Sequence, residues 1–142
     1  LVYKRALSFQ VQDFSGVTGA CLLVKTAVYD EMHGLDEQFA VAFNDVDFCL
    51  RVRDAGYRIA WTPYAQLTHY ESKSRGGDEK DPVKAARFAA EQQRLYTVHG
   101  KENILDDPYY NPNLTRDRED FSESDDLRGL KEGRITVRYR GA

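Results

Sequence analysis

The sequence of 142 residues contains no apolar stretch that approaches the roughly 18 residues a membrane-spanning helix requires. It also lacks a charged segment followed by an apolar one near its start, so no signal peptide is predicted. Neither sign of charge dominates: 20 Lys and Arg side chains face 23 Asp and Glu, a formal net charge of −3. This balance argues against a nucleic-acid-binding module with a basic face. With 42% hydrophobic and 30% charged residues, the composition is typical of one soluble globular domain.

Cysteine is scarce. Cys21 and Cys49 lie 28 residues apart and neither belongs to a CxxC pair. The spacing therefore favours two small buried apolar residues in a reducing compartment over a disulfide or a zinc site. The sequence starts with Leu1 instead of Met, which favours a piece of a longer chain.

Charge is spread unevenly along the chain. Residues 1–77 carry 8 basic and 9 acidic side chains, residues 101–126 carry 3 and 9, and residues 127–142 carry 5 and 1. We therefore expect a balanced folded part over 1–100 and a polar C-terminal extension over 101–142.

Apolar runs and stop signals predict a mixture of helices and strands, which indicates α/β organisation. The expected elements are a helix over 1–11, a buried strand over 17–25, a helix over 26–32 ending near Gly34, a turn near Asp36 and Glu37, a strand over 57–62 stopped by Pro63, and an edge strand over 135–139. Loops are expected over 66–81 and over 107–114, the second with aromatic anchors.

Two helices have clear end signals. The first is expected over 44–55, with Asn44 as N-cap and Gly56 as the C-terminal stop. The second is expected to begin with the pair Asp81-Pro82 and to run to about His99 before Gly100. An apolar face on this helix predicts packing on a sheet. That face consists of Ala85, Phe88, Ala89, Gln92, Leu95 and Tyr96.

Candidate chemistry begins with Asp45 and Asp47 in the first turn of the helix over 44–55. A D-x-D spacing is typical of divalent-cation sites. On a helix, however, residues two apart point about 200° away from each other, so both are not expected to bind one ion. One of them at a helix N-terminus is well placed to act as a general base. The alternative is that both carboxylates only stabilise the helix start.

A second candidate region is polar and follows the strand over 57–62. His69 there is a potential metal ligand. Ser72, Ser74 and Arg75, next to two glycines, are typical of a loop that touches phosphate. The alternative is a solvated surface loop. His33 and His99 have no clustered partners in the sequence and are interpreted as structural.

Five elements occur in order between residues 17 and 77. They are the runs VTGACLLVK, GLDEQF, NDVDF, GYRIAW and HYESKSRGG. In this order they resemble the C-terminal half of the catalytic domain of family 2 glycosyltransferases, especially bacterial rhamnosyltransferase-like and O-antigen-type enzymes. The resemblance implies an α/β fold that is a partial GT-A (nucleotide-diphospho-sugar transferase) half-domain with a few strands, helices on the sheet and an irregular C-terminal tail.

The resemblance also implies roles for individual residues. Asp45 matches the base that deprotonates the acceptor hydroxyl, although Asn44 stands where the family often has Glu. Asp47 matches a second acid that is either structural or in contact with the acceptor, and His69 matches a histidine that completes metal coordination in metal-dependent members. Two further groups match the acceptor-side strand and the donor phosphate loop; they are Thr18, Gly19 and Ala20, and Ser72, Ser74 and Arg75.

The implied reaction is a direct displacement with inversion at the anomeric carbon. A divalent cation (Mn or Mg) is expected in the full-length enzyme, but none in this fragment, because the nucleotide-binding half with its own D-x-D is missing. The implied partners are a nucleotide-sugar donor and a glycan or lipid-linked acceptor. The implied location is cytoplasmic, which includes a peripheral position at the inner membrane face.

Two other functions stay open at this point. One is a non-catalytic interaction or dimerisation module with a glycosyltransferase-like fold, since an exposed apolar surface favours a homodimer. The other is a metal hydrolase that would use Asp45, Asp47 and His69.

Overall fold

A computed structural model describes residues 10–68, 81–111, 113–115, 122 and 124. The predicted helix over 1–11, apart from its last two residues, and the edge strand over 135–139 lie outside the described residues. So do four candidate site residues, which are His69, Ser72, Ser74 and Arg75. The chain divides into two units, Leu1–Tyr109 and Tyr110–Ala142.

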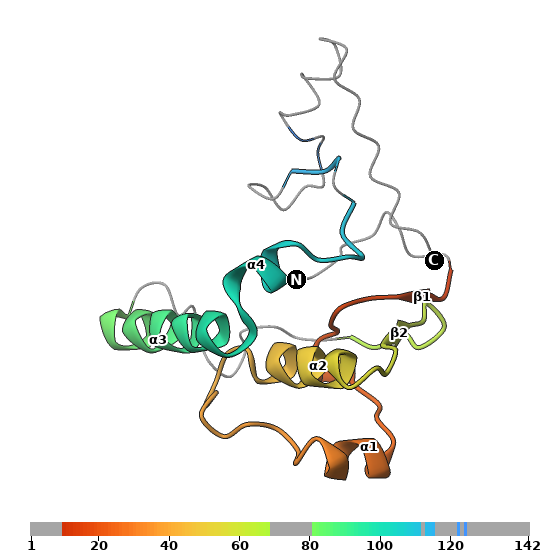
Figure 1. Ribbon diagram of the computed structural model, residues 1–142, viewed down its shortest axis with the longest axis horizontal. Coiled ribbons are helices and arrows are strands. Elements are labelled where there is room, and N and C mark those ends of the chain that lie inside the picture. Colours follow the sequence, from red (N-terminus) through yellow and green to blue (C-terminus); the bar gives the residue numbers. More distant parts are fainter. Residues whose placement is uncertain (1–9, 69–80, 112, 116–121, 123, 125–142) are drawn as a thin grey trace. The chain divides into compact units, whose positions relative to one another are not determined.

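Short strands and four helices make up the described part of the first unit (Figure 1). They are β1 (Gln12–Asp13), a 3-10 turn η1 (Gly19–Cys21), α1 (Thr26–Glu31), α2 (Asn44–Asp54), β2 (Ala60–Trp61), α3 (Pro82–His99) and α4 (Lys101–Leu105). Strands β1 and β2 pair antiparallel, with Gln12 opposite Trp61. The strand predicted over 57–62 is thus confirmed only at residues 60 and 61. The helix predicted over 26–32 is confirmed as α1.

Helix α2 is the centre of the first unit. Its residues 47–50 are all buried, and because successive residues on a helix are 100° apart, these four cover most of its circumference. Phe48 and Val52 form a first core cluster with Val28 of α1. On another side, Leu50 forms a second core cluster with two other residues, Phe39 and Leu95. The helix expected over 44–55 is confirmed as α2. Its apolar side chains pack into both core clusters.

The start of α2 differs from the prediction. Phe43, not Asn44, occupies the N-cap position, and it does so in the left-handed region at φ 64°. Asn44 is the first helical residue, and its Oδ1 accepts from the N–H of Asp45 at 2.8 Å. The Phe43 ring packs against Phe88 of α3, with ring centroids 4.9 Å apart, which helps to hold a backbone conformation that is uncommon for a bulky residue.

Helix α3 begins and ends where its cap signals predict. Asp81 Oδ1 accepts from the N–H of Val83 at 2.9 Å, Pro82 is the first helical residue, and Gly100 follows at φ 77°. The predicted packing of α3 on a sheet stays a prediction. Its buried residues, Glu91 and Leu95, belong to the C-terminal half, which contacts α2, and the only described sheet consists of two short strands.

The prediction of a strand over 17–25 was wrong. Residues 19–21 form the 3-10 turn, and the extended residues after it have no strand partner among the described residues. Leu22 and Val24 pack against the first core cluster, whereas Leu23 between them is 98% exposed. This alternation is typical of a strand, but an extended segment becomes one only when a neighbouring backbone pairs with it.

The predicted turn is present, and so is the irregular loop over its described residues. Asp36 Oδ1 accepts from the N–H of Gln38 at 2.9 Å, which closes the turn expected near residues 36 and 37. The described residues of the loop over 107–114 form no helix, and in the second unit the Tyr110 hydroxyl donates to the carbonyl of Thr115 at 2.5 Å. Across all described residues, no helix is both long enough and apolar enough to cross a membrane.

Candidate functional site

Asp45 and Gly19 are in direct contact, although they lie 26 positions apart in the sequence. Asp45 Oδ2 accepts from the backbone N–H of Gly19 at 2.8 Å, and its Oδ1 accepts from the N–H of Val46 at 2.9 Å. A Cβ atom at position 19 would lie 3.2 Å from Asp45 Cβ, closer than side chains normally approach. Glycine at position 19 therefore lets this carboxylate approach the turn without a shift of either group.

The other predicted acceptor-side residues lie in the same place. Thr18 and Ala20 are exposed, and Thr18 Oγ1 accepts from the N–H of Ala20 at 3.3 Å at the start of η1. Asp45 itself is half-buried. Each carboxylate oxygen can accept more than one hydrogen bond, so a half-buried Asp45 held by two N–H groups can still accept a proton from an incoming hydroxyl. The structure thus brings Thr18, Gly19, Ala20 and Asp45 together.

Asp47 points to the other side of α2, as the two-residue spacing on a helix predicts. It is 1% exposed, and its Oδ1 lies 2.8 Å from Nε2 of His99 at the end of α3. Its Oδ2 accepts from Nε and Nη2 of Arg51 at 2.9 and 2.8 Å. Both oxygens are engaged inside the protein, an arrangement that fits the structural alternative of the two roles the resemblance implies.

Arg51 extends this buried contact to the turn after α1. Its Nη1 donates to the carbonyl of Met32 at 2.5 Å, and its Nη2 donates to the carbonyl of Gly34 at 2.9 Å. The four-residue spacing of Asp47 and Arg51 on a helix is a signal that could have predicted their ion pair. No sequence pattern predicts the contact with His99, which lies 52 positions from Asp47, or the bonds from Arg51 to backbone carbonyls. His99 was interpreted as structural and without a clustered partner, and its contact with Asp47 was missed.

The described residues do not fit a divalent cation. No group of three or more His, Cys, Asp or Glu among them is arranged to hold a metal ion. The D-x-D string supplies only Asp45, because the oxygens of Asp47 are taken by Arg51 and His99. A metal hydrolase that uses both carboxylates is therefore not supported by this geometry.

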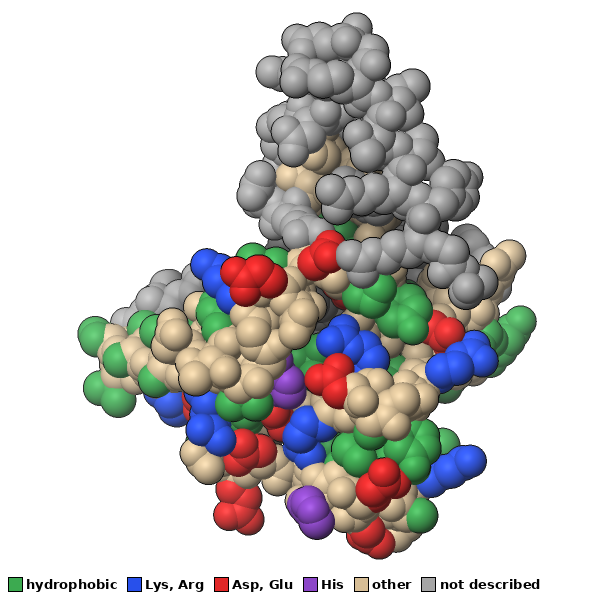
Figure 2. Space-filling view, in the orientation of Figure 1, with side chains coloured by type: hydrophobic (Ala, Val, Ile, Leu, Met, Phe, Trp, Pro, Cys, Tyr) green, Lys and Arg blue, Asp and Glu red, His purple; other side chains and the backbone are tan. Residues whose placement is uncertain are grey.

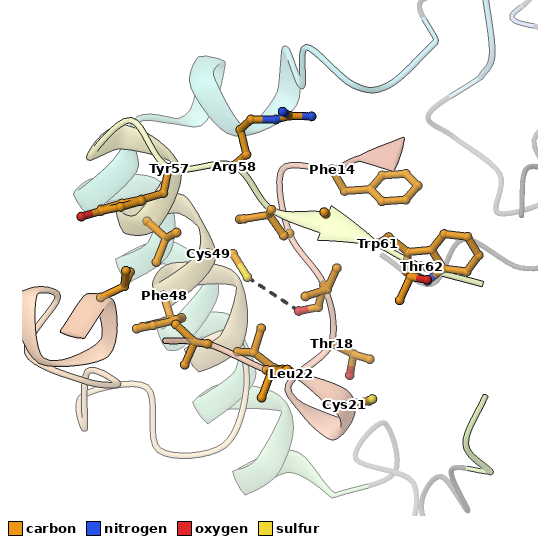
Figure 3. A pocket seen from close by; sticks show the side chains of 18 of the residues that line it. Phe14, Thr18, Cys21, Leu22, Phe48, Cys49, Tyr57, Arg58, Trp61 and Thr62 are labelled. Carbon is orange, nitrogen blue, oxygen red and sulfur yellow. Dashed lines mark hydrogen bonds between the residues drawn. The ribbon is translucent and has the colours of Figure 1, made fainter. Parts of the chain in front are cut away.

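A groove of about 660 Å³ lies between the segment that carries Thr18 and Leu22 and the segment that carries Trp61 and Thr62 (Figure 3). Its lining is largely apolar and does not include Asp45. A sugar hydroxyl needs polar partners, so the groove is a poorer candidate for the chemistry than the exposed turn beside Asp45.

The two cysteines differ in their surroundings. Cys49 is buried on α2, and its Sγ lies 3.8 Å from the carbonyl of Val17, marked by the dashed line in Figure 3. Burial raises the pKa of this thiol, and the charge of Asp45 acts in the same direction. Cys21 is exposed, so the prediction that both cysteines are buried was wrong for Cys21.

Charges of both signs are interspersed on the face seen in Figure 2. Red and blue side chains alternate there with hydrophobic ones over the described part of the chain, and they do not gather into one patch of a single sign on that face.

The chain is similar to segments of longer proteins. It is 47% identical over 114 residues to the uncharacterized protein y4gI of Sinorhizobium fredii, an alignment that covers 78% of the chain and 12% of that protein. It is 33% identical over 104 residues to the O-antigen biosynthesis protein RfbC of Myxococcus xanthus, covering 73% of the chain and 8% of that protein. It is 31% identical over 80 residues to N-acetylglucosaminyl-diphospho-decaprenol L-rhamnosyltransferase of Mycobacterium tuberculosis. This alignment covers 56% of the chain and 24% of that protein.

The chain thus spans between 8% and 24% of the length of these relatives. The names of the second and third relatives support a glycosyltransferase family for it. No family profile matches the chain, and no solved structure matches it.

Proposed function

We propose that this chain is the acceptor-side part of an inverting glycosyltransferase of the family 2, GT-A type. In the longer protein it would help to move a sugar from a nucleotide-diphospho-sugar to a hydroxyl of a glycan or lipid-linked acceptor. The similarity to an O-antigen biosynthesis protein and to a rhamnosyltransferase supports this proposal. So does the order of the five sequence elements between residues 17 and 77.

The observation that carries the proposal is the contact between Asp45 and Gly19. Asp45 is held by two backbone N–H groups beside an exposed turn of small residues, where a sugar hydroxyl has access. In the proposed step Asp45 accepts the hydroxyl proton while the hydroxyl oxygen bonds to the anomeric carbon. The bond from that carbon to the nucleotide diphosphate breaks on the opposite face, and the diphosphate leaves with the electron pair.

The donor site would belong to the rest of the longer protein. The exposed Leu23 and the apolar groove beside it are a surface that a further part of a catalytic domain would cover. We therefore expect the isolated chain to be inactive. A divalent cation near His69, a phosphate contact by Ser72, Ser74 and Arg75, and a cytoplasmic location all stay predictions for the longer protein.

One observation favours a second candidate function. The same exposed Leu23 and groove would also suit a non-catalytic module that associates with a second copy of itself. Such a module would have no need for an aligned carboxylate at Asp45, so the two functions differ in what they require of this residue.

The deciding experiment compares two matched variants of the full-length protein. Asp45→Asn removes the proton acceptor and keeps the side-chain volume, and we expect it to lower kcat by at least about 100-fold. Asp54→Asn changes the same residue type on the same helix, where the side chain is 61% exposed, and we expect it to keep full turnover. Sugar transfer is measured with a panel of nucleotide sugars. Retained turnover in Asp45→Asn would remove Asp45 from the role of base.

A further inference from the structure

Helix α3 holds the segment that leads into α2 at several points. Arg94 Nη2 donates to Asp36 Oδ2 at 2.8 Å, and Glu91 Oε2 accepts from the backbone N–H of Ala42 at 2.6 Å. The third contact is the one between His99 and Asp47 inside the first turn of α2. Phe43, which directly follows Ala42, has its backbone in the left-handed region. A local conformation of this kind persists where the surrounding structure holds it.

Two contacts on opposite sides of α2 thus hold its first turn in place. Asp45 is bonded to the N–H of Gly19 on one side, and Asp47 is bonded to His99 on the other. Because these two aspartates lie about 200° apart around the helix axis, a rotation or shift that loosens one contact strains the other. The position of the Asp45 carboxylate thus depends on a contact that it does not itself make.

The His99 side chain is buried at the C-terminal end of α3. Its side chain is 6% exposed, it is the last residue of α3, and Gly100 turns the chain immediately after it. Its Nε2, not Nδ1, is the nitrogen that meets Asp47 Oδ1. A buried carboxylate that loses one of its partners is costly, so Asp47 is expected to move or to draw in water when this nitrogen is removed.

The geometry points to His99 as a positioning residue for the reaction, one that acts through Asp47 to hold Asp45 at the angle needed to accept the hydroxyl proton. This inference rests on the proposed function, because it takes Asp45 to be the base. A misplacement of a reacting group by about 1 Å can cost roughly 100-fold in rate. The expected signature is therefore a loss of kcat with an unchanged KM for the nucleotide-sugar donor.

The test uses two amide substitutions in the full-length protein. In His99→Gln the amide nitrogen reaches the place of Nε2, whereas in His99→Asn it reaches only the place of Nδ1. We expect His99→Asn to lower kcat by about 10- to 100-fold and His99→Gln to stay within about threefold of the wild type. Equal kcat in the two variants, or a loss that appears only in KM, would overturn the inference.

A stability control sits one turn earlier on α3. Leu95→Val removes a methylene from the second core cluster and leaves the contact with Asp47 in place. We expect this variant to melt at a lower temperature with kcat unchanged. A loss of kcat equal to that of His99→Asn would show that lower stability alone explains the effect of His99, and it would overturn the inference. If His99→Asn does not yield folded protein, Asp47→Asn weakens the same contact, and a kcat equal to wild type in that variant also overturns the inference.

The two proposals fail in different ways. Full turnover in Asp45→Asn rejects Asp45 as the base, whatever the His99 variants do. An inactive Asp45→Asn together with equal kcat in both His99 variants rejects only the positioning role.

Discussion

Asp47 and His99 meet inside the protein at 2.8 Å, although one lies in the first turn of α2 and the other ends α3. The remaining oxygen of Asp47 is bonded to Arg51, which continues to the carbonyls of Met32 and Gly34. A carboxylate that is 1% exposed is tolerated only with such partners, because an unpaired charge in the interior is costly. This contact links α3 and the turn after α1 to one helix.

The first prediction concerns the stability of this buried contact. Arg51→Met leaves Asp47 without its strongest partner, and we expect the free energy of unfolding to fall by about 3–5 kcal/mol. The matched control is Arg58→Met, which removes an ion pair with Asp13 from an arginine that is 80% exposed. A change of about 0–1 kcal/mol is expected there. Urea unfolding measures both, and equal losses would contradict the prediction.

The second prediction concerns the close approach of Gly19 to Asp45. The added methyl group in Gly19→Ala would lie 3.2 Å from Asp45 Cβ, so Asp45 has to move by a few tenths of an ångström. We expect kcat of the full-length protein to fall by about tenfold. In the control Gly16→Ala, the methyl group meets Cys49 Cβ at 3.4 Å, close to ordinary contact, and kcat is expected to stay the same. A wild-type kcat in Gly19→Ala would argue against a precisely placed Asp45.

The third prediction concerns stability at low pH. The hydrogen bond from Arg94 holds the pKa of Asp36 below its ordinary value of 3.8, and the N–H of Gln38 acts in the same direction. A lowered folded-state pKa contributes stability that is present above the unfolded-state pKa and is lost as the pH falls through the folded-state value. The melting temperatures of wild type and Asp36→Asn should therefore differ near neutral pH and converge as the pH falls below 3.8 and through the lower folded-state pKa of Asp36. Glu37→Gln removes the same charge at an exposed neighbouring position and is the control; a difference in Asp36→Asn that persists at low pH would contradict the prediction.

The fourth prediction concerns thiol reactivity. Cys21 is exposed, whereas Cys49 is buried and burial raises the pKa of its thiol. Since the thiolate is the reactive form, a maleimide should label Cys21 within minutes at neutral pH and should reach Cys49 only after unfolding. Mass spectrometry of the native chain should show one label, and Cys21→Ser should show none. Two labels on the folded protein would indicate that α2 opens readily.

The fifth prediction concerns donor binding by the isolated chain. If the donor site belongs to the rest of the longer protein, titration calorimetry with UDP- and TDP-sugars and Mn²⁺ should give no micromolar binding. The full-length protein under the same conditions is the positive control. Micromolar binding by the 142-residue chain would contradict the division of the catalytic domain that we propose.

Local signals in the sequence were sufficient for α3 and for the presence of α1 and α2, but they did not predict α4. The pair Asp81-Pro82 and Gly100 predicted the two ends of α3, because caps and stops depend on neighbouring residues. The spacing of Asp45 and Asp47 likewise predicted that their side chains diverge, since helix geometry alone decides this. The contact of Asp45 with the turn at Gly19 agrees with their joint appearance in the family-like order of motifs.

Long-range partners were beyond such signals. Residues 17–25 have the alternation of a strand, but whether they form one depends on a second backbone, which the described chain does not provide. The partner of Asp47 is a histidine 52 positions away with no motif around it. Phe43 occupies the N-cap position that the sequence predicts for Asn44. Its ring packs on Phe88, and this tertiary contact outweighs the local preference for a polar cap.

The two core clusters have one helix in common, since Phe48 and Val52 belong to the first and Leu50 to the second. Unfolding of α2 would therefore disrupt both clusters. Amide hydrogens in the middle of α2 should therefore exchange with deuterium only when the whole first unit opens. Those in the first turns of α3, where Val83 and its neighbours are exposed, should exchange through local fraying and report a much smaller opening free energy.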